Sequence, residues 1–505
     1  MAQFPPLGKR RRRRKRRRTA LKQPNIIWFC TDQQRYDTIH ALGNPYLRTP
    51  NMGRLVNEGV AFERTYCQNP ICSPSRGSFL TGRYPRTTRS SINGNDHFSK
   101  DEVLVTKMLA DNGYECGLIG KLHLTSHYRR EEERVDDGYS YWQYSPQPCD
   151  DWAPGINKYM DWLKEKGVDW YSEYTMPCEW PPRNGYMLPE RIKGLKEEDH
   201  QTTWCVDKAI EFMQNRTDDR PFCLSVNPFD PHPPFDPPQA YKDRLNIEDM
   251  PLPLWKEGEL DNKPFAHKDC YLHGSQKGMV RDTVTMTDEE KREVCRDYYA
   301  EIELMDHQLG RLLDYLDESG LRKDTLIVYM SDHGEMLGDH GIYWKGGYFY
   351  EGLVRVPLIM SWPGVIKEGL RSNALVELVD VAPTLLELAG LPIPKFMQGK
   401  SLASILKGES DPSHHKDAVY TEFYFTTMLM HRIYATMYFD GRYKIAVHHG
   451  EQICELYDLK NDPNEFENLW NNPRYATLQN DMVRACFDHA IMCNIDNILG
   501  RSFNY

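Results

Sequence analysis

The stretch Asn25–Asp32, NIIWFCTD, has the pattern of a buried strand that ends in polar residues. Four later stretches of the 505-residue chain repeat it: ECGLIGKLHL (115–124), FCLSVNP (222–228), DTLIVYMSD (324–332) and VPLIMSWPG (356–364). Helical periodicities lie between them. The clearest covers residues 297–316, where one face carries Ile302, Met305, Leu309, Leu312 and Leu316. Strands that alternate with helices predict an α/β fold with a largely parallel sheet and helices on both faces.

Polar residues stand where a sheet of this kind binds ligands, beyond the carboxyl ends of its strands. The first strand is followed by Asp32 and Gln33, and the strand at 324–332 leads into Asp332 and His333. Two carboxylates from separate strand ends, each beside another possible ligand, suit a hard divalent cation. We therefore expect these four residues to surround one metal ion, with the two carboxylates within about 6 Å of each other.

The stretch Cys72–Gly82, CSPSRGSFLTG, predicts a short helix over 74–81, with Ser73 as N-cap and Gly82 just past its end. Cys72 then lies at the positive end of the helix. Arg76 falls in the first turn, where the helix dipole prefers an anion. A cation and a helix N-terminus that converge on one point make an anion site. The alternative is a buried structural cysteine beside a surface arginine.

Three further segments supply cations or imidazoles. GKLHL offers Lys121 and His123, which would share one side of an extended chain. NPFDPHPPF places His232 between prolines, and Lys345 precedes a glycine pair. Each residue alone is more often structural. Together with Arg76 around one metal, they would form a site for a tetrahedral anion.

Composition limits the partners. No apolar run reaches the length of a membrane span, and the N-terminus lacks the apolar stretch of a signal peptide, so we expect a cytoplasmic protein. Thirteen scattered cysteines favour reduced thiols. The run Lys9–Arg18 holds ten cations in a chain of net charge −10. It could bind nucleic acid or an acidic membrane surface, but no nucleic-acid motif accompanies it, and we favour a disordered basic tail over residues 1–22.

The sequence resembles the type I sulfatases of the alkaline phosphatase superfamily. The family motif is Cys-x-Pro-Ser-Arg followed by Thr-Gly, found here as Cys72, Pro74, Ser75, Arg76, Thr81 and Gly82. The likeness continues through the Lys-x-His of GKLHL, the PHPP loop, SDHGEMLGDHG, the lysine before EGLVRVP, and ELYDLKNDPNE, over about residues 24–470. Gln33 departs from the pattern, because many relatives carry a second aspartate there.

This resemblance implies a function and a maturation step. The fold would be an alkaline-phosphatase-like sandwich, and the activity that of a sulfatase, a sulfuric ester hydrolase that cleaves sulfate monoesters. A formylglycine-generating or anaerobic sulfatase-maturing enzyme would convert Cys72 to formylglycine, whose hydrate attacks sulfur. The metal, calcium by family habit with magnesium or manganese open, would be held by Asp32, Gln33, Asp332, His333 and the oxidised Cys72.

The other side chains take their roles from the same resemblance. His232 and Lys345 would bind the sulfate and help to protonate the leaving oxygen. His123 would deprotonate the second hydroxyl of the hydrate, so that sulfate leaves. Arg76 and Lys121 would hold the hydrate and neutralise charge.

Three alternatives remain open. A phosphonate monoester or phosphodiester hydrolase of the same superfamily can share the oxidised cysteine and a residue like Gln33, but tends to lack the Lys-x-His pair. A cysteine-dependent phosphatase needs five residues between cysteine and arginine, and here there are three. A non-catalytic anion-binding protein would not need the complete catalytic set.

Domain organisation and substrate are less strongly indicated. We expect a catalytic domain over residues 23–412 with a large central mixed sheet. A smaller C-terminal α+β domain, residues 413–505, would hold an antiparallel sheet whose strands include AVYTEFYF, RIYATMYF and RYKIAVHH, with a hairpin at Asp440-Gly441. The aromatic-rich stretch 139–186 contains Trp142, Trp152, Trp162, Trp170 and Trp180. It is either a small core or a rim for a substrate, with sulfated carbohydrates first and small aryl or alkyl sulfates second.

Overall fold

The computed structural model describes residues 23–126, 132–149, 152–170, 194–275, 282–424 and 433–493; the predicted tail 1–22 lies outside them. Within these residues the strands are β1 Asn25–Thr31, β2 Val60–Tyr66, β3 Glu115–Gly120, β4 Tyr139–Tyr144, β5 Phe222–Asn227, β6 Thr325–Ser331, β7 Arg355–Val356, β8 Leu358–Ser361, β9 Leu370–Glu377, β10 Val419–Tyr424, β11 Tyr434–Phe439, β12 Tyr443–His448 and β13 Glu455–Asp458. The α-helices are α1 Pro50–Asn57, α2 Cys72–Thr81, α3 Pro85–Thr88, α4 Val105–Asp111, α5 Lys158–Lys166, α7 Gln201–Gln214, α8 Gln239–Lys242, α9 Phe265–His273, α10 Asp288–Glu318, α11 Glu351–Val354, α12 Val381–Leu388, α13 Ala403–Leu406 and α14 Ala476–Met492.

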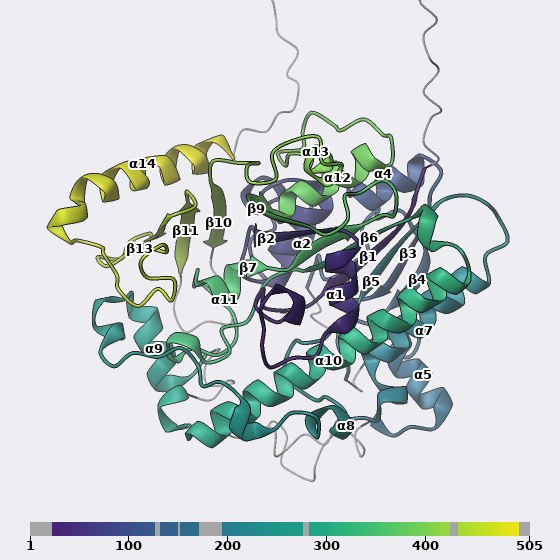
Figure 1. Cartoon of the computed structure of the whole chain (residues 1–505), viewed down its shortest axis with the longest axis horizontal. Helices are drawn as coiled ribbons and strands as arrows, with labels where there is room; N and C mark the ends of the chain where they lie inside the picture. The colour runs from purple at the N-terminus through teal and green to yellow at the C-terminus, as the bar shows by residue number, and fades with distance from the viewer. Residues whose placement is uncertain are drawn as a thin grey trace, which may run out of the picture.

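A nine-stranded mixed sheet forms the centre of the molecule (Figure 1). Its order is β4-β3-β5-β1-β6-β8-β2-β7, and β9 pairs with β2. The strands from β4 to β6 are parallel to one another. The stretch at 356–364 gives β8, which is antiparallel to β6 and β2. Between β6 and β8 the only α-helix is the four-residue α11, too short for the crossover that a parallel connection requires.

Alternate residues of the central strands face two separate cores. Trp28 and Val328 belong to one core, which α2, α4 and α12 cover. Phe29 and Tyr329 belong to the other, which α1, α7 and α10 cover. The five apolar residues predicted to share a helix face are all buried along α10, which begins earlier than expected because Thr287 caps it in a capping box. Strands with apolar residues on both faces need this double cover.

The predicted strand at 115–124 is shorter than expected. β3 ends at Gly120, whose φ is +90° and where a Cβ would lie 2.0 Å from the carbonyl oxygen of Asn227. The chain turns there, and His123 has a φ of +59°. Lys121 and His123 therefore do not lie on one side of an extended chain, and that prediction is wrong.

A second, four-stranded antiparallel sheet, β10-β11-β12-β13, follows as predicted. Asp440 N–H donates to the carbonyl of Tyr443 (3.2 Å), which closes the hairpin at Asp440-Gly441. Helix α14 packs on this sheet and buries Met482 and Cys486 (Figure 1). The C-terminal segment thus docks on its own chain as far as residue 493.

The tryptophan-rich stretch contributes to packing. Trp152 and Trp170 are buried in the two main cores, and Trp142 and Trp162 pack against the same cores. Trp180 lies outside the described residues. These four rings favour the core alternative over an aromatic rim. The twelve cysteines of the described residues are free thiols. None of the described helices is both long and apolar enough to cross a membrane.

Candidate active site

Cys72 is the first residue of α2, and all ten residues of this helix are buried. The N-cap is Ile71, so the prediction that Ser73 caps the helix is wrong. Ser73 lies inside the first turn, and its N–H donates to Asn93 Oδ1 (2.9 Å). The predicted end is confirmed, because Gly82 has a φ of +69° and donates its N–H to the carbonyl of Ser78. Arg76 is buried, which excludes the alternative of a structural cysteine beside a surface arginine.

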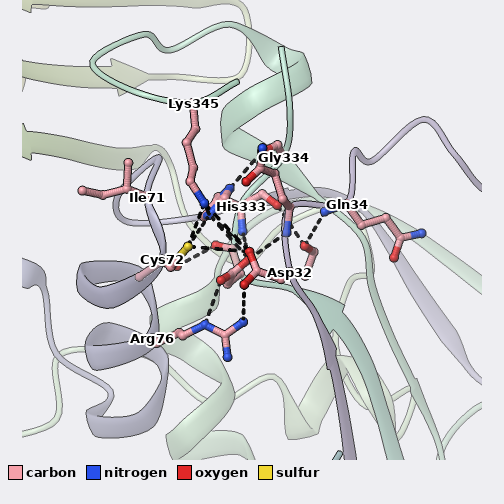
Figure 2. A network of polar contacts seen from close by, with 12 residues as sticks. Asp32, Gln34, Ile71, Cys72, Arg76, His333, Gly334 and Lys345 are labelled. Atoms are coloured by element: carbon pink, nitrogen blue, oxygen red, sulfur yellow. Dashed lines mark hydrogen bonds and ion pairs between the residues drawn. The ribbon is translucent and has the colours of Figure 1, made fainter. Parts of the chain in front are cut away.

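The predicted metal ligands converge at the carboxyl ends of β1 and β6 (Figure 2). Asp32 follows β1, Asp332 and His333 follow β6, and Cys72 faces them from α2. Their ligand atoms all lie within 4.8 Å of one another, in agreement with the expected distance. His333 donates its Nδ1–H to the carbonyl of Gly334 (2.9 Å), which leaves Nε2 facing Cys72 Sγ at 3.2 Å.

Two cations hold the carboxylates. Arg76 Nε donates to Asp332 Oδ2 (2.8 Å), and its guanidinium also lies 3.5 Å from Asp32 Oδ2. Lys121 Nζ donates to the same carboxylate oxygen of Asp32. Both cations are almost fully buried. Burial raises the pKa of Asp32, but the cations around it, Lys121 first, hold that pKa well below its usual range. Asp32 is therefore ionised and available to a metal.

Lys345 approaches the cluster from the opposite side (Figure 2). Its Nζ donates to Cys72 Sγ (2.9 Å) and lies 3.4 Å from His333 Nε2. Burial and Asp32 raise the pKa of the Cys72 thiol, but Lys121, Lys345 and His333 outweigh them and lower it to about 5. The position of Sγ thus favours a negatively charged or electron-rich group.

The donor set fits a cation. Gln33 donates its Nε2–H to Glu335, while its Oε1 is buried and forms no hydrogen bond within the described part of the chain. Burial and the charge of Asp32 raise the pKa of Asp332 although Arg76 lies beside it. The backbone N–H of Gln33 donates to Asp332 Oδ1 (3.0 Å), so the residue that carries the unpaired amide oxygen adjoins a buried carboxylate. Oxygen donors of both kinds are ligands that divalent cations accept.

The two histidines of the predicted anion site lie in different surroundings. The His232 ring centroid is 4.4 Å from that of Phe229 and 5.1 Å from that of Trp344, and its Nδ1–H donates to the carbonyl of Pro233. Burial and the charge of Lys345 lower the pKa of His232 well below its usual value. His123 is half-buried in a loop whose backbone N–H groups, including its own, donate to Glu132.

Several supporting residues were missed from the sequence. Ser75 Oγ donates to the carbonyl of Asp332 (2.6 Å) and so joins α2 to β6. The Phe229 ring lies against His232 and 5.2 Å from Lys121 Nζ. The Trp344 ring also packs against His232, at an angle of 79° between the ring planes. Each lies within three residues of a predicted residue, but an aromatic or serine side chain carries no signal of such a role.

A cavity of about 540 Å³ lies apart from this cluster. Its lining includes Arg35, Asp37, Tyr350, Arg355 and Glu465, and no predicted site residue lines it. The side chains of Cys72, Lys121 and Lys345 are at most 3% exposed, so the two lysines shield Cys72 from solvent. His232, which lies near Lys345 and Asp32, is half-buried and therefore more accessible than they are.

Comparison with known proteins gives the family. The family model described as Sulfatase matches residues 24–391, and that of the N-sulphoglucosamine sulphohydrolase C-terminal region matches residues 338–490. The chain is 30% identical to an arylsulfatase of Clostridium perfringens, over 90% of this chain and 91% of that protein. It is 29% identical to an N-acetylglucosamine-6-O-sulfatase of Bacteroides thetaiotaomicron, over 92% and 85%.

Solved structures share the fold. A protein in complex with its substrate D-glucosamine-2-N,6-O-disulfate has a TM-score of 0.72 at 24% identity, covering 94% of this chain and 99% of the other. A phosphonate monoester hydrolase from Silicibacter pomeroyi has a TM-score of 0.78 at 24% identity, covering 95% and 97%. The expected alkaline-phosphatase-like architecture is thus confirmed.

Proposed function

Because the chain belongs to the sulfatase family, we propose that it removes sulfate from sulfated carbohydrates with Cys72, oxidised to formylglycine, as nucleophile. Its class, a sulfuric ester hydrolase, follows from family membership. The sugar, the oxidation and the role of each residue are the proposal. The single observation that carries it is the convergence of Cys72, three predicted ligands and three cations in one buried cluster.

A divalent cation, calcium first with magnesium or manganese as alternatives, would be held by Asp32, Gln33, Asp332 and His333. It would supply Lewis acidity next to residue 72 and offset the charge of the two carboxylates. The Nε2 of His333, which faces Cys72 while Nδ1 is bound to a backbone carbonyl, and the unpaired Oε1 of Gln33 support this assignment. Formylglycine supplies a hydrated aldehyde, with one hydroxyl for attack on sulfur and a second whose deprotonation lets sulfate leave.

The other side chains of the cluster would have separate roles in the reaction. Lys345, which lies 2.9 Å from Sγ, and His232 would bind the sulfate oxygens. An incoming sulfate offsets the charge of Lys345 and so restores part of the lowered pKa of His232, which lets the imidazole pass a proton to the leaving oxygen. His123 would accept the proton of the second hydroxyl. Arg76 and Lys121 would hold residue 72 and Asp32 in place.

The domain boundary between residues 412 and 413 is part of the proposal. The C-terminal sheet would close one side of the site and support Lys345. A Cβ on Gly347, two residues beyond Lys345, would lie 2.7 Å from Ile433 and 3.0 Å from Phe423 of the C-terminal part. Lys444 of β12 also donates to the carbonyl of Phe349 (2.8 Å). The loop that carries Lys345 thus rests directly on the second sheet.

Glucosamine 6-O-sulfates are the first substrates to test. One relative is named an N-acetylglucosamine-6-O-sulfatase, and a structural neighbour was solved with a disulfated glucosamine. The competing function is phosphonate monoester or phosphodiester hydrolysis, which Gln33 and the likeness to the Silicibacter pomeroyi enzyme favour. The Lys121-x-His123 pair favours sulfate.

Two preparations of the full chain test this function. One is co-expressed with a formylglycine-generating or anaerobic maturing enzyme, and the other is expressed without either. We expect the first to lose the Cys72 thiol mass in its peptide and to cleave a 6-O-sulfated glucosamine with a higher kcat/KM than any phosphonate monoester or phosphodiester. The second should be largely inactive. Full turnover with Cys72 wholly unoxidised contradicts the nucleophile, and a higher kcat/KM for phosphonates than for every sulfate contradicts the substrate class.

A further inference from the structure

A second buried group of potential metal ligands lies behind the loop that carries His232. His200, Asp230 and Asp236 each offer a ligand atom, and these atoms all lie within 4.8 Å of one another. His200 precedes α7, Asp230 follows β5, and Asp236 lies in the loop before α8. Glu301 of α10 joins them, because its Oε1 accepts the N–H of Asp236 (2.6 Å). We refer to these four residues as the His200 cluster.

The cluster carries more negative charge than its neighbours offset. Three of its four members are carboxylates, and all are at most 8% exposed. The nearby Lys242 donates to Asp297 (2.9 Å), which also accepts from Arg296, so this lysine is already paired. Burial raises the pKa of Asp236 to about 7 and that of Glu301 well above its usual value. Buried carboxylates of this kind require protons or a cation.

Two atoms of the cluster have no hydrogen-bond partner among the described residues. They are Nε2 of His200 and Oε2 of Glu301, both fully buried. His200 Nε2 lies 3.8 Å from Asp236 Oδ2. Two ligand atoms of one metal ion can lie this far apart. His200 Nδ1 lies 3.4 Å from Asp230 Oδ2 and also 3.4 Å from the backbone nitrogen of Thr202. A metal on Nε2 requires the tautomer in which Nδ1–H donates to Asp230.

In a third buried group, His267, His448 and Glu455, the Nε2 of His267 also has no hydrogen-bond partner among the described residues, but the single carboxylate is satisfied. Both oxygens of Glu455 are occupied there, one by His448 Nε2 (2.7 Å) and the other by the hydroxyl of Tyr457 (2.5 Å). Burial raises the pKa of Glu455, but His267 and then His448 outweigh this effect and hold the pKa below its usual value. One carboxylate with two donors needs no further cation, whereas the His200 cluster has three carboxylates.

We propose that the His200 cluster binds a divalent cation, Zn²⁺ or Mn²⁺, distinct from the metal next to Cys72. One imidazole nitrogen and up to three carboxylate oxygens match the ligands that these two ions accept. The grouped ligand atoms belong to His200, Asp230 and Asp236, and Glu301 orients Asp236 through its backbone N–H, so the ion would have three protein ligands in a buried place. The inference stands independently of the sulfatase chemistry, because none of its residues belongs to the catalytic proposal.

Such an ion would fix the position of His232. Asp230 and Asp236 lie at the two ends of the segment that contains His232, and one ion would tie both ends together. The carbonyl of Asp230 also accepts the N–H of Asp32 (3.0 Å). Next to it, Phe229 N–H donates to Gln201 Oε1 at the start of α7 (3.0 Å). The cation would therefore connect α7 and α10, which pack side by side (Figure 1), with the edge of the active site.

Metal content of the full chain tests the proposal. The protein is expressed in medium with Zn²⁺ or Mn²⁺, freed of loose metal by gel filtration, and analysed for all divalent metals together. We expect two equivalents per wild-type chain and one in Asp236→Asn. The matched control is Glu303→Gln, a buried carboxylate two residues from Glu301 that accepts the N–H of Arg48 and lies outside the cluster. It should keep two.

Thermal unfolding gives a second reading that does not depend on activity. Adding Zn²⁺ or Mn²⁺ to chelator-treated Asp332→Asn protein should raise its Tm, and the same addition should not raise that of Asp332→Asn/Asp236→Asn. If Asp236→Asn does not fold, the count is made in Asp332→Asn, which lacks a ligand of the metal next to Cys72 and should still hold one equivalent. No bound metal in Asp332→Asn under either ion, or equal content in wild type and folded Asp236→Asn, overturns the proposal and leaves the carboxylates to share protons.

Discussion

Replacing Arg76 by methionine should strongly destabilise the protein when divalent metal is absent. The guanidinium is 1% exposed and lies 2.8 Å from Asp332 Oδ2 and 3.5 Å from Asp32 Oδ2, and both carboxylates are fully buried. At an effective dielectric constant of about 20, one such pair contributes roughly 4 kcal/mol. Removing one partner of a buried pair costs about 3–5 kcal/mol, because the other charge stays buried without compensation. We expect Arg76→Met to lose about this amount.

The assay is urea unfolding at neutral pH in the presence of a chelator, followed by fluorescence and circular dichroism so that a two-state transition can be checked. The control is Arg442→Met, which removes an equally short pair with Asp458 from a site where the arginine is 46% exposed, and should cost at most about 1 kcal/mol. Adding divalent metal should recover part of the loss in Arg76→Met. A loss no larger than that of Arg442→Met would refute the view that Arg76 holds the two carboxylates together.

Three further outcomes are expected. Removal of divalent metal by a chelator should lower turnover and Tm, and adding back Ca²⁺, Mg²⁺ or Mn²⁺ in turn identifies the metal; unchanged turnover in protein shown to be metal-free contradicts a metal site. Burial raises the pKa of Glu422 to about 7, so its contribution to wild-type stability should be lost as pH rises from about 4.5 to 7. The variant Glu422→Gln has no such contribution to lose. In urea unfolding, its stability relative to wild type should therefore rise by on the order of 3 kcal/mol across that pH range. A chain that begins at Lys22 should keep full turnover on small sulfate esters, because the ten cations of Lys9–Arg18 include no apolar anchor; a large loss contradicts a dispensable tail.

Much of the candidate site could be predicted from local sequence. Asp32 and Asp332 each follow an apolar run of strand length, and parallel strand ends meet at one edge of a sheet. The spacing of Cys72 and Arg76 sets them one helical turn apart, so both face the same point. These features depend on residues close in sequence. For this reason the architecture, the central strands and the convergence of the ligands were predictable.

What failed depended on contacts between distant segments. The backbone of Asn227 turns the chain at Gly120 and sets the geometry of His123, which no pattern within GKLHL indicates. The tryptophans pack into cores that exist only after α5 and β4 have docked.

The sequence by itself therefore determined the α/β fold, the family and the candidate ligands of the central cluster, because periodicity and motif spacing are local. Only the tertiary structure decided which buried charges have partners. Four segments bring His200, Asp230, Asp236 and Glu301 together, and compensation of charge depends on distances across the whole chain rather than along it.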